Sequence, residues 1–141
     1  MAEMKAKERL ALERHHMPEQ DAIIRSRNFE EVNLGYSVEY AMEEADRCLR
    51  CKNPVCIEGC PVSVKIPDFI KMISEGKFQE AADILKEDNA LPAVCGRVCP
   101  QEEQYEARCI YIKKGKPSVA IGYLERFAAD WERQNAKIKE P

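Results

Sequence analysis

Four cysteines in the middle of the chain, spaced C-x2-C-x4-C-x3-C and followed at once by a proline, restrict the fold more than any other feature. They are Cys48, Cys51, Cys56 and Cys60, with Pro61 next. Thiols packed this densely either pair as disulfides or bind metal. We therefore expect the function of the chain to depend on its sulfur atoms.

Metal binding is favoured over disulfide pairing. Seven cysteines leave one unpaired in any all-disulfide scheme. The first sixteen residues lack the apolar segment of a secretory signal, so we expect a cytoplasmic protein whose thiols stay reduced.

No stretch reaches the roughly 18 apolar residues of a membrane span. The net charge of −3 gives no sign of the basic face that nucleic-acid binding favours. We expect neither membrane nor nucleic acid as a partner.

The metal that the spacing favours is iron. The run is close to C-x2-C-x2-C-x3-C-P, which holds iron–sulfur clusters in bacterial ferredoxins and whose fourth cysteine serves a second cluster. A second group, Cys95-x3-Cys99-Pro100, repeats the Cys-Pro ending, and Cys109 follows. Two four-iron clusters with four ligands each require more than seven thiolates, so one ligand is of another kind or one cluster is incomplete. Zinc is the alternative, but four-cysteine zinc sites often use two C-x2-C pairs, and this chain has one.

The remaining sequence predicts an all-α fold in one domain over residues 1–141. Caps and apolar spacing predict helices over about 1–16, 37–47, 66–75, 78–87 and 117–135. Residues 17–36 should form a connector, Cys95 and Cys99 a short turn, and 101–116 a polar loop. The mean hydropathy is −0.51 and large apolar residues are few. We therefore expect a thin core that bound clusters cross-link.

A family resemblance covers nearly the whole chain. From Cys48 to Gln101 the sequence is CLRCKNPVCIEGCPVSVKIPDFIKMISEGKFQEAADILKEDNALPAVCGRVCPQ. With the lead-in MPEQDAIIRSRNFEEVNLGYS and the tail VAIGYLERFAADW, it resembles the N-terminal iron–sulfur domain of the glutamate synthase small (beta) subunit and dihydropyrimidine dehydrogenase family. The resemblance implies an α-helical ferredoxin-like domain built around two [4Fe–4S] clusters.

The resemblance also implies the ligands. The first cluster would take Cys48, Cys51, Cys56 and Cys109. The second would take Cys60, Cys99, a further cysteine and Glu125, although periodicity alone places Glu125 at the edge of an apolar stripe with its head in water. The chain departs from the family at Tyr105, where CPQEEQYEARC replaces C-P-Q-x-x-x-C-E-x-x-C. Cys95, one helical turn from Cys99, is a candidate substitute, and the missing thiolate leaves the second cluster absent, labile or rewired.

By this resemblance the domain would belong to an NAD(P)H-dependent oxidoreductase, most like the glutamate synthase small subunit, and would relay electrons between FAD and a large or partner subunit. No G-x-G-x-x-G follows a strand, and no base and nucleophile are paired. We therefore expect FAD and NADPH on further domains of the same subunit and no substrate active site in these residues. The chain ends at KIKEP, about where those domains would begin, so we expect an N-terminal fragment or a free-standing homologue. The alternative is a zinc-stabilised structural or subunit-interaction module with no redox role.

Overall fold

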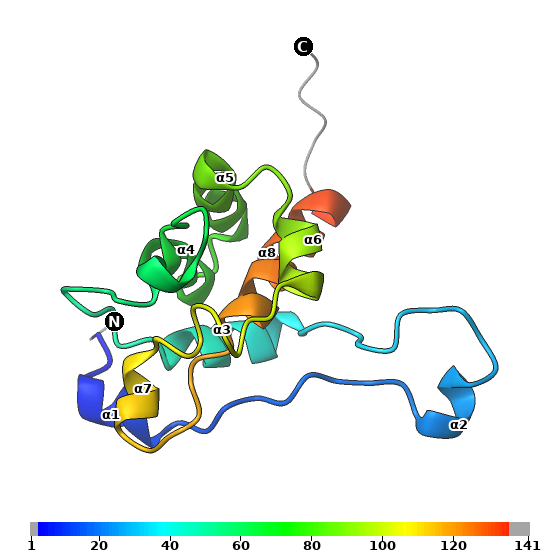
Figure 1. Ribbon diagram of the computed structural model, residues 1–141, viewed down its shortest axis with the longest axis horizontal. Helices are drawn as coiled ribbons and strands as arrows, with labels where there is room; N and C mark the ends of the chain where they lie inside the picture. The colour runs from blue at the N-terminus through cyan, green and yellow to red at the C-terminus, as the bar shows by residue number, and fades with distance from the viewer. Residues whose placement is uncertain (1–2, 136–141) are drawn as a thin grey trace, which may run out of the picture.

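The computed structural model describes residues 3–135 and is helical throughout (Figure 1). The α-helices are α1 Ala6–Ala11, α2 Ala22–Arg25, α3 Val38–Asp46, α4 Ile66–Ser74, α5 Phe78–Asp88, α6 Pro92–Val98, α7 Ile110–Lys113 and α8 Ile121–Asn135, and a 3-10 helix, η1, spans Ile57–Gly59. Within these residues the strand-like pairing is a single bridge between Glu19 and Asn33. The expected all-α class is confirmed.

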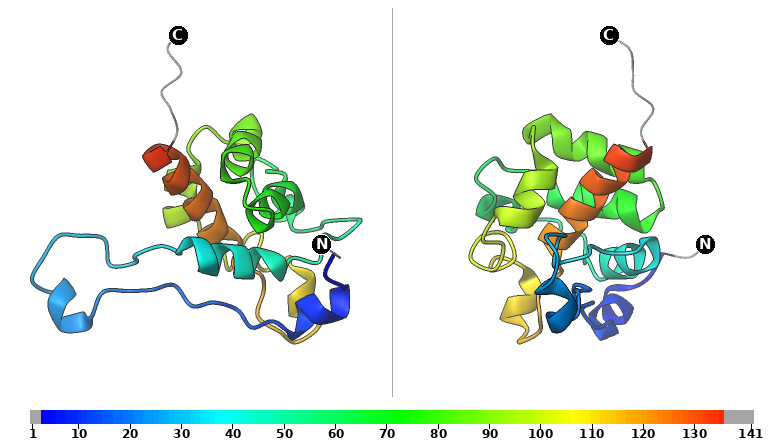
Figure 2. Two further views of the ribbon diagram at one scale, coloured as in Figure 1. Left: turned by 180° about the vertical axis from the view of Figure 1, so that it is seen from behind. Right: turned by 90° about the vertical axis from the view of Figure 1, so that its right-hand side faces the viewer.

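Helix α8 is the centre of the domain, and α3, α4, α5 and α6 pack around it. Its apolar stripe, including Leu124 and Phe127, faces the α4–α5 pair, where Phe69, Ile73 and Leu85 are buried. The core is made mostly of these aliphatic and aromatic side chains, which supply the main hydrophobic stabilisation of the domain. In the right-hand view of Figure 2, α8 (orange to red) runs obliquely across the helical body. Residues on its different faces therefore reach different parts of the molecule.

Helices α6 and α8 touch along their backbones because one residue of α6 has no side chain. A Cβ added to Gly96 would lie 2.7 Å from the backbone nitrogen of Arg126. The side chain of Gln101 closes the same contact, donating a hydrogen bond of 2.9 Å from Nε2 to the carbonyl of Gly96. This packing fixes the position of α6 relative to α8.

The expected connector is an arm that projects from the body (Figures 1 and 2). Its two sides are joined where Gln20 N–H donates to Val32 O at 2.8 Å and Leu34 N–H to Pro18 O at 2.8 Å. Arg126 pins its base through a 2.9 Å hydrogen bond to Asn33 O. The arm carries exposed apolar side chains, among them Ile23, Ile24, Leu34 and a fully exposed Phe29.

Several helix boundaries follow the local signals in the sequence. Ser37 caps α3 by accepting a hydrogen bond from Tyr40 N–H. Pro67 lies in the first turn of α4, and Gly76 follows that helix with a φ of 73°, a conformation that glycine adopts without the cost of a Cβ clash. These three predictions are confirmed.

Other boundaries were predicted wrongly. The helix expected over 1–16 is only α1, and residues 1–2 lie outside the described residues; beyond α1 the chain becomes extended, and its polar groups bond to the body of the protein. The segment expected to be a turn around Cys95 is helix α6. The loop expected over 101–116 contains α7 and buries Tyr105, Glu106 and Tyr111. Helix α8 begins at Ile121 rather than near residue 117, because the carbonyls of Pro117 and Ser118 bond to Arg47.

None of the helices within residues 3–135 combines the length and the apolar character needed to cross a bilayer.

Candidate iron–sulfur sites

The first site gathers four cysteines from two parts of the chain. Cys48 follows α3, Cys51 lies in the next loop, Cys56 precedes η1, and Cys109 is the N-cap of α7. All four line one cavity of about 150 Å³. The rest of the wall is largely apolar and includes Leu49, Val55, Ile66, Ile70, Ile110, Val119 and Ile121.

Burial raises the pKa of three thiols of this first site, Cys48, Cys51 and Cys56. Burial raises the pKa of Cys48 to about 11, and the nearby Cys109 and Cys51 add to the effect. Burial raises the pKa of Cys56 to about 12, with further increases from Cys48, Cys109 and Cys51. Thiolates gathered this closely repel one another unless a cation binds between them, so metal binding would release protons and relieve that repulsion.

Two arginines brace the first site from outside. Arg9 of α1 donates hydrogen bonds to Asp46 O at 2.7 Å and to Cys48 O at 3.3 Å. The buried Arg47 guanidinium lies 4.8 Å from the centre of the Tyr111 ring, and Tyr111 donates its hydroxyl to Arg47 O at 2.7 Å. Arg47 precedes Cys48 and Tyr111 follows Cys109 by two residues, so this contact ties together the two segments that carry the cysteines.

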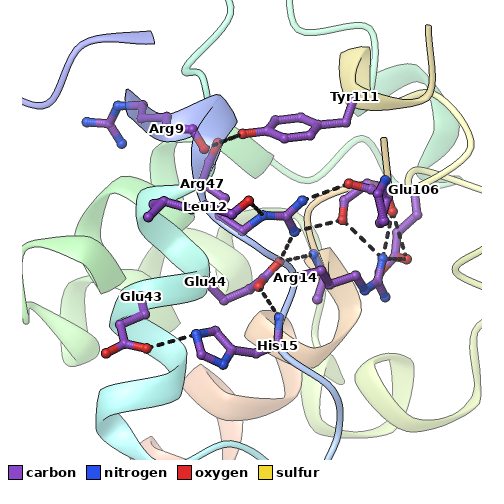
Figure 3. A network of polar contacts seen from close by, with 12 residues as sticks. Arg9, Leu12, Arg14, His15, Glu43, Glu44, Arg47, Glu106 and Tyr111 are labelled. Carbon is purple, nitrogen blue, oxygen red and sulfur yellow. Dashed lines mark hydrogen bonds and ion pairs between the residues drawn. The ribbon is translucent and has the colours of Figure 1, made fainter. Parts of the chain in front are cut away.

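Glu44 is the centre of the hydrogen-bond network that fixes Arg47 (Figure 3). Its carboxylate accepts hydrogen bonds from Arg47 Nη1 at 2.6 Å, from His15 N–H at 2.8 Å and from Ala120 N–H at 2.9 Å. Arg14 binds the neighbouring carboxylate of Glu106 at 3.0 Å. The N-terminal segment, α3 and the start of α8 are therefore joined by buried, charge-assisted hydrogen bonds, which are stronger than neutral ones.

The second site lies between η1, α6 and α8. Cys60 ends η1, Cys95 lies on α6, Cys99 ends that helix, and Glu125 comes from α8. Burial raises the pKa of Cys99 to about 11, and the proximity of Cys95, Glu125 and Cys60 raises it further. Cys60, Cys95 and Glu125, the other residues that the sequence suggested for a second cluster, are thus near enough to Cys99 to affect its charge.

Tyr105 reaches the same second site. Its side chain is 2% exposed, and its hydroxyl donates a 3.2 Å hydrogen bond to Oε2 of Glu125. Asn89 donates to the other carboxylate oxygen, Oε1, at 3.0 Å. Glu125 is only 3% exposed, and burial raises its pKa to about 7, while the two hydrogen bonds act in the opposite direction. The interpretation that placed Glu125 with its head in water is wrong.

The two sites are adjacent in the chain, because the same two segments carry cysteines of both. Only η1 separates Cys56 of the first site from Cys60 of the second. A Cβ added to Gly59, in η1, would lie 2.7 Å from the Cα of Tyr105. The turn between the sites is therefore packed directly against the segment that runs from Cys99 to Cys109.

Comparison with known proteins agrees with this geometry. Residues 25–137 match the family model described as dihydropyrimidine dehydrogenase domain II, 4Fe-4S cluster. The chain belongs to this family. It is therefore an iron–sulfur domain of the type found in oxidoreductase subunits, and its helical fold is that of a 4Fe–4S ferredoxin-type domain.

Curated relatives of this 4Fe–4S family match over most of the chain. The glutamate synthase [NADPH] small chain of Azospirillum brasilense is 37% identical over 83% of this chain and 25% of its own length. The corresponding small chain of Escherichia coli is 40% identical over 84% and 25%. The NAD-dependent dihydropyrimidine dehydrogenase subunit PreT of Salmonella typhimurium is 37% identical over 89% and 29%. The chain thus spans about a quarter of the length of these relatives.

The first site fits the cluster that the family name specifies. Its cavity is lined by four thiols, the soft donors that iron–sulfur clusters take, and most of its other lining residues are apolar. Within residues 3–135, no three metal-binding side chains meet closely around one point. The second site offers three thiols and a carboxylate, a set that also provides four donors.

Sequence reasoning missed the supporting residues of this family member. Asn89, Glu44 and Arg47 were not among the candidates, yet all three are buried and bonded at or near the sites. They lie in ordinary polar stretches, and their partners are far away along the chain. No motif marks them in a single sequence.

Proposed function

We propose that this domain relays single electrons within an NAD(P)H-dependent oxidoreductase of the glutamate synthase small-subunit type. The observation that carries the proposal is the convergence of four cysteines around one cavity in a chain of a 4Fe–4S family. A bound cluster supplies reversible one-electron chemistry, with a potential set by ligands, nearby hydrogen bonds and burial.

We assign the first [4Fe–4S] cluster to Cys48, Cys51, Cys56 and Cys109. The thiolates would hold the irons, and the apolar wall formed by residues such as Ile66 and Ile70 would keep water away from the sulfur atoms. Tyr111 would keep the two ligand-bearing segments together by bonding the carbonyl of Arg47, and Arg9 of α1 would support Cys48 by bonding its carbonyl. These groups orient the ligands and do no chemistry on a substrate.

We assign a second [4Fe–4S] cluster to the site that contains Cys60, Cys99 and Glu125. The support is the burial of Cys60 and Glu125 and their electrostatic effect on the half-buried Cys99. A carboxylate ligand would give this cluster a potential different from that of the all-thiolate cluster, because ligand identity sets the potential. Two clusters of unequal potential suit a relay between two partners.

The electron donor and acceptor would lie outside these residues. The relatives are about four times longer than the matched segment, and two of them are named for NADPH. We propose FAD- and NADPH-binding domains on the same subunit as one partner and a large oxidoreductase subunit as the other. Residues 1–141 would then be a single helical domain of that longer subunit.

The test is metal analysis after anaerobic purification and reconstitution. Iron, acid-labile sulfide and zinc are measured per chain, and the protein is titrated with a reductant while visible absorption is followed. We expect iron and sulfide in equal amounts, together with absorption that bleaches reversibly on reduction. Zinc without labile sulfide would refute the electron-transfer function and support the structural module.

A further inference from the structure

We propose that Cys95 supplies the thiolate that the second site lacks, and that Tyr105 is a positioning residue for Glu125 rather than an iron ligand. The inference rests on the proposed iron–sulfur function. It would make the donor set of the second site Cys60, Cys95, Cys99 and Glu125.

Tyr105 occupies the place of the expected cysteine but has a different task. Its ring is buried, and its hydroxyl donates to Oε2 of Glu125. A hydroxyl engaged as a donor to a carboxylate is directed at that carboxylate and not at a metal. A phenolate is also a harder ligand than the thiolates that iron–sulfur clusters prefer. The geometry therefore assigns Tyr105 to Glu125.

Glu125 is fixed by hydrogen bonds at both oxygens. Asn89 donates to Oε1 at 3.0 Å and Tyr105 to Oε2 at 3.2 Å. Each carboxylate oxygen can accept two hydrogen bonds, so these two bonds leave one lone pair free on each oxygen. The carboxylate is thus held in one orientation and retains the capacity to bind a metal.

Cys95 is placed to join this donor set. It lies one helical turn before Cys99, whose N–H donates to Cys95 O at 3.1 Å. The sulfur of Cys95 lies 3.7 Å from Oδ1 of Asn89, the residue that bonds Glu125. The sulfur is therefore directed toward the interior of the site. Gly96, pressed against the backbone of α8, prevents α6 from turning it away.

The arithmetic of the cysteines supports the same assignment. The chain has seven, and the first site uses four of them. The remaining three are Cys60, Cys95 and Cys99, and the proximity of Cys95 and Cys60 contributes to the raised pKa of Cys99. Cys95 is the one thiol for which neither the first site nor the family pattern provides a role.

The decisive experiment compares iron and labile sulfide per chain in four proteins reconstituted without oxygen: wild type, Cys95→Ser, Tyr105→Cys and the Cys95→Ser/Tyr105→Cys double variant. We expect about eight irons in the wild type and about four in Cys95→Ser. The double variant should regain about eight, because its thiolate at position 105 replaces the one removed. Val94→Ser, an exposed change on the same helix, is the matched control and should retain about eight.

Separate outcomes distinguish this inference from the proposed function. Cys95→Ser with about eight irons, or a wild type that never exceeds four, overturns the role of Cys95 but leaves the first cluster and electron transfer intact. A wild type without iron and sulfide overturns both. Low-temperature electron paramagnetic resonance of the reduced protein identifies which cluster is lost, since the signal of the first site should be unchanged in Cys95→Ser.

Tyr105→Phe tests the positioning role, since it keeps the ring and removes the hydroxyl. We expect the iron content to stay at the wild-type value and the midpoint potential of the second cluster to shift, with the first unchanged. A change in folding stability alone would leave both potentials where they are. Two unaltered potentials would show that Tyr105 does not position Glu125.

Discussion

At the scale of single residues, the contact that most determines the order of the first site is the ion pair between Glu44 and Arg47. Both side chains are fully buried, and together they join segments that are distant in the sequence. Removing one partner of such a pair leaves an uncompensated buried charge, which is strongly destabilising. The adjacent Glu43 pairs with His15 at the surface and provides a natural comparison.

We predict that Glu44→Gln lowers the free energy of unfolding by about 3 kcal/mol, because Arg47 loses its counter-charge in the interior. Urea denaturation of the cluster-loaded protein measures this loss. Glu43→Gln should change stability by less than about 0.5 kcal/mol, since exposed ion pairs contribute little. Equal effects of the two substitutions would contradict the role assigned to the buried pair.

The sequence predicts the cysteines of the two sites but not the residues that support them. Spacing and the Cys-Pro endings identify the cysteines, because thiol chemistry restricts what such runs can do. The proximity of Cys109 to a cysteine run that ends at Cys60 came from the family resemblance, since spacing does not indicate which distant segments meet. Glu44, Arg47 and Asn89 could not be predicted, because their importance arises from partners that only the folded chain supplies.

At the scale of elements, the contact between α6 and α8 sets the geometry of the second site. We predict that Gly96→Ala destabilises the protein by about 1–3 kcal/mol, the usual cost of inserting a methyl group into a filled space. It should also lower the iron bound at the second site, because α6 carries Cys95 and Cys99. Thermal unfolding and iron analysis measure the two effects. Val98→Ala, at an exposed position of α6, should alter neither, and a stable Gly96→Ala variant with full iron would refute the argument.

The arm of residues 17–36 should contribute little to stability. We predict that Phe29→Ala changes the free energy of unfolding by less than about 0.5 kcal/mol, because its ring contacts no core residue. The same substitution at the buried Phe69 should cost about 3–5 kcal/mol. Chemical denaturation of both variants checks the contrast, and a large loss for Phe29→Ala would mean that the arm packs on the body.

The sequence predicts elements well where one local signal dominates, as at Ser37 and Pro67. It fails for the segment around Cys95, which was expected to be a short turn but forms helix α6 packed against α8. It fails also after α1, where Arg14 bonds to Glu106 and the backbone N–H of His15 to Glu44, so that the chain follows the body of the protein instead of continuing as a helix. Tertiary contacts override local preference in both places.

At the scale of the whole molecule, the helical core and the segments that carry the cysteines are stabilised by different interactions. The core of α4, α5 and α8 is held by apolar packing, whereas the loops of the first site depend on their cysteines and on a few hydrogen bonds. We predict that removing iron under anaerobic chelation exposes these loops to trypsin at Arg50, Lys52 and Arg108, while Lys71 in α4 stays protected. Mass spectrometry of a timed digest gives the order of cleavage.

Arg27, exposed on the arm, is the internal control for this digest and should be cut at the same rate with and without iron. Simultaneous cleavage at Lys71 and Arg108 in the iron-free protein would show that the domain unfolds as a unit. That result would contradict a core that is stable without its clusters.

The close packing of Gly59 on Tyr105 has a consequence for the timing of the relay. Three residues, Ile57–Gly59, lie between Cys56 and Cys60. Their Cα atoms can therefore lie no more than about 14 Å apart even in an extended chain, and the 3-10 turn brings them closer. If both proposed clusters are bound, an electron would cross from one site to the other past this short turn, with no need for a hinge or a moving loop. For the proposed relay, we then expect turnover to depend on contact with the electron donor and acceptor more than on transport inside the domain.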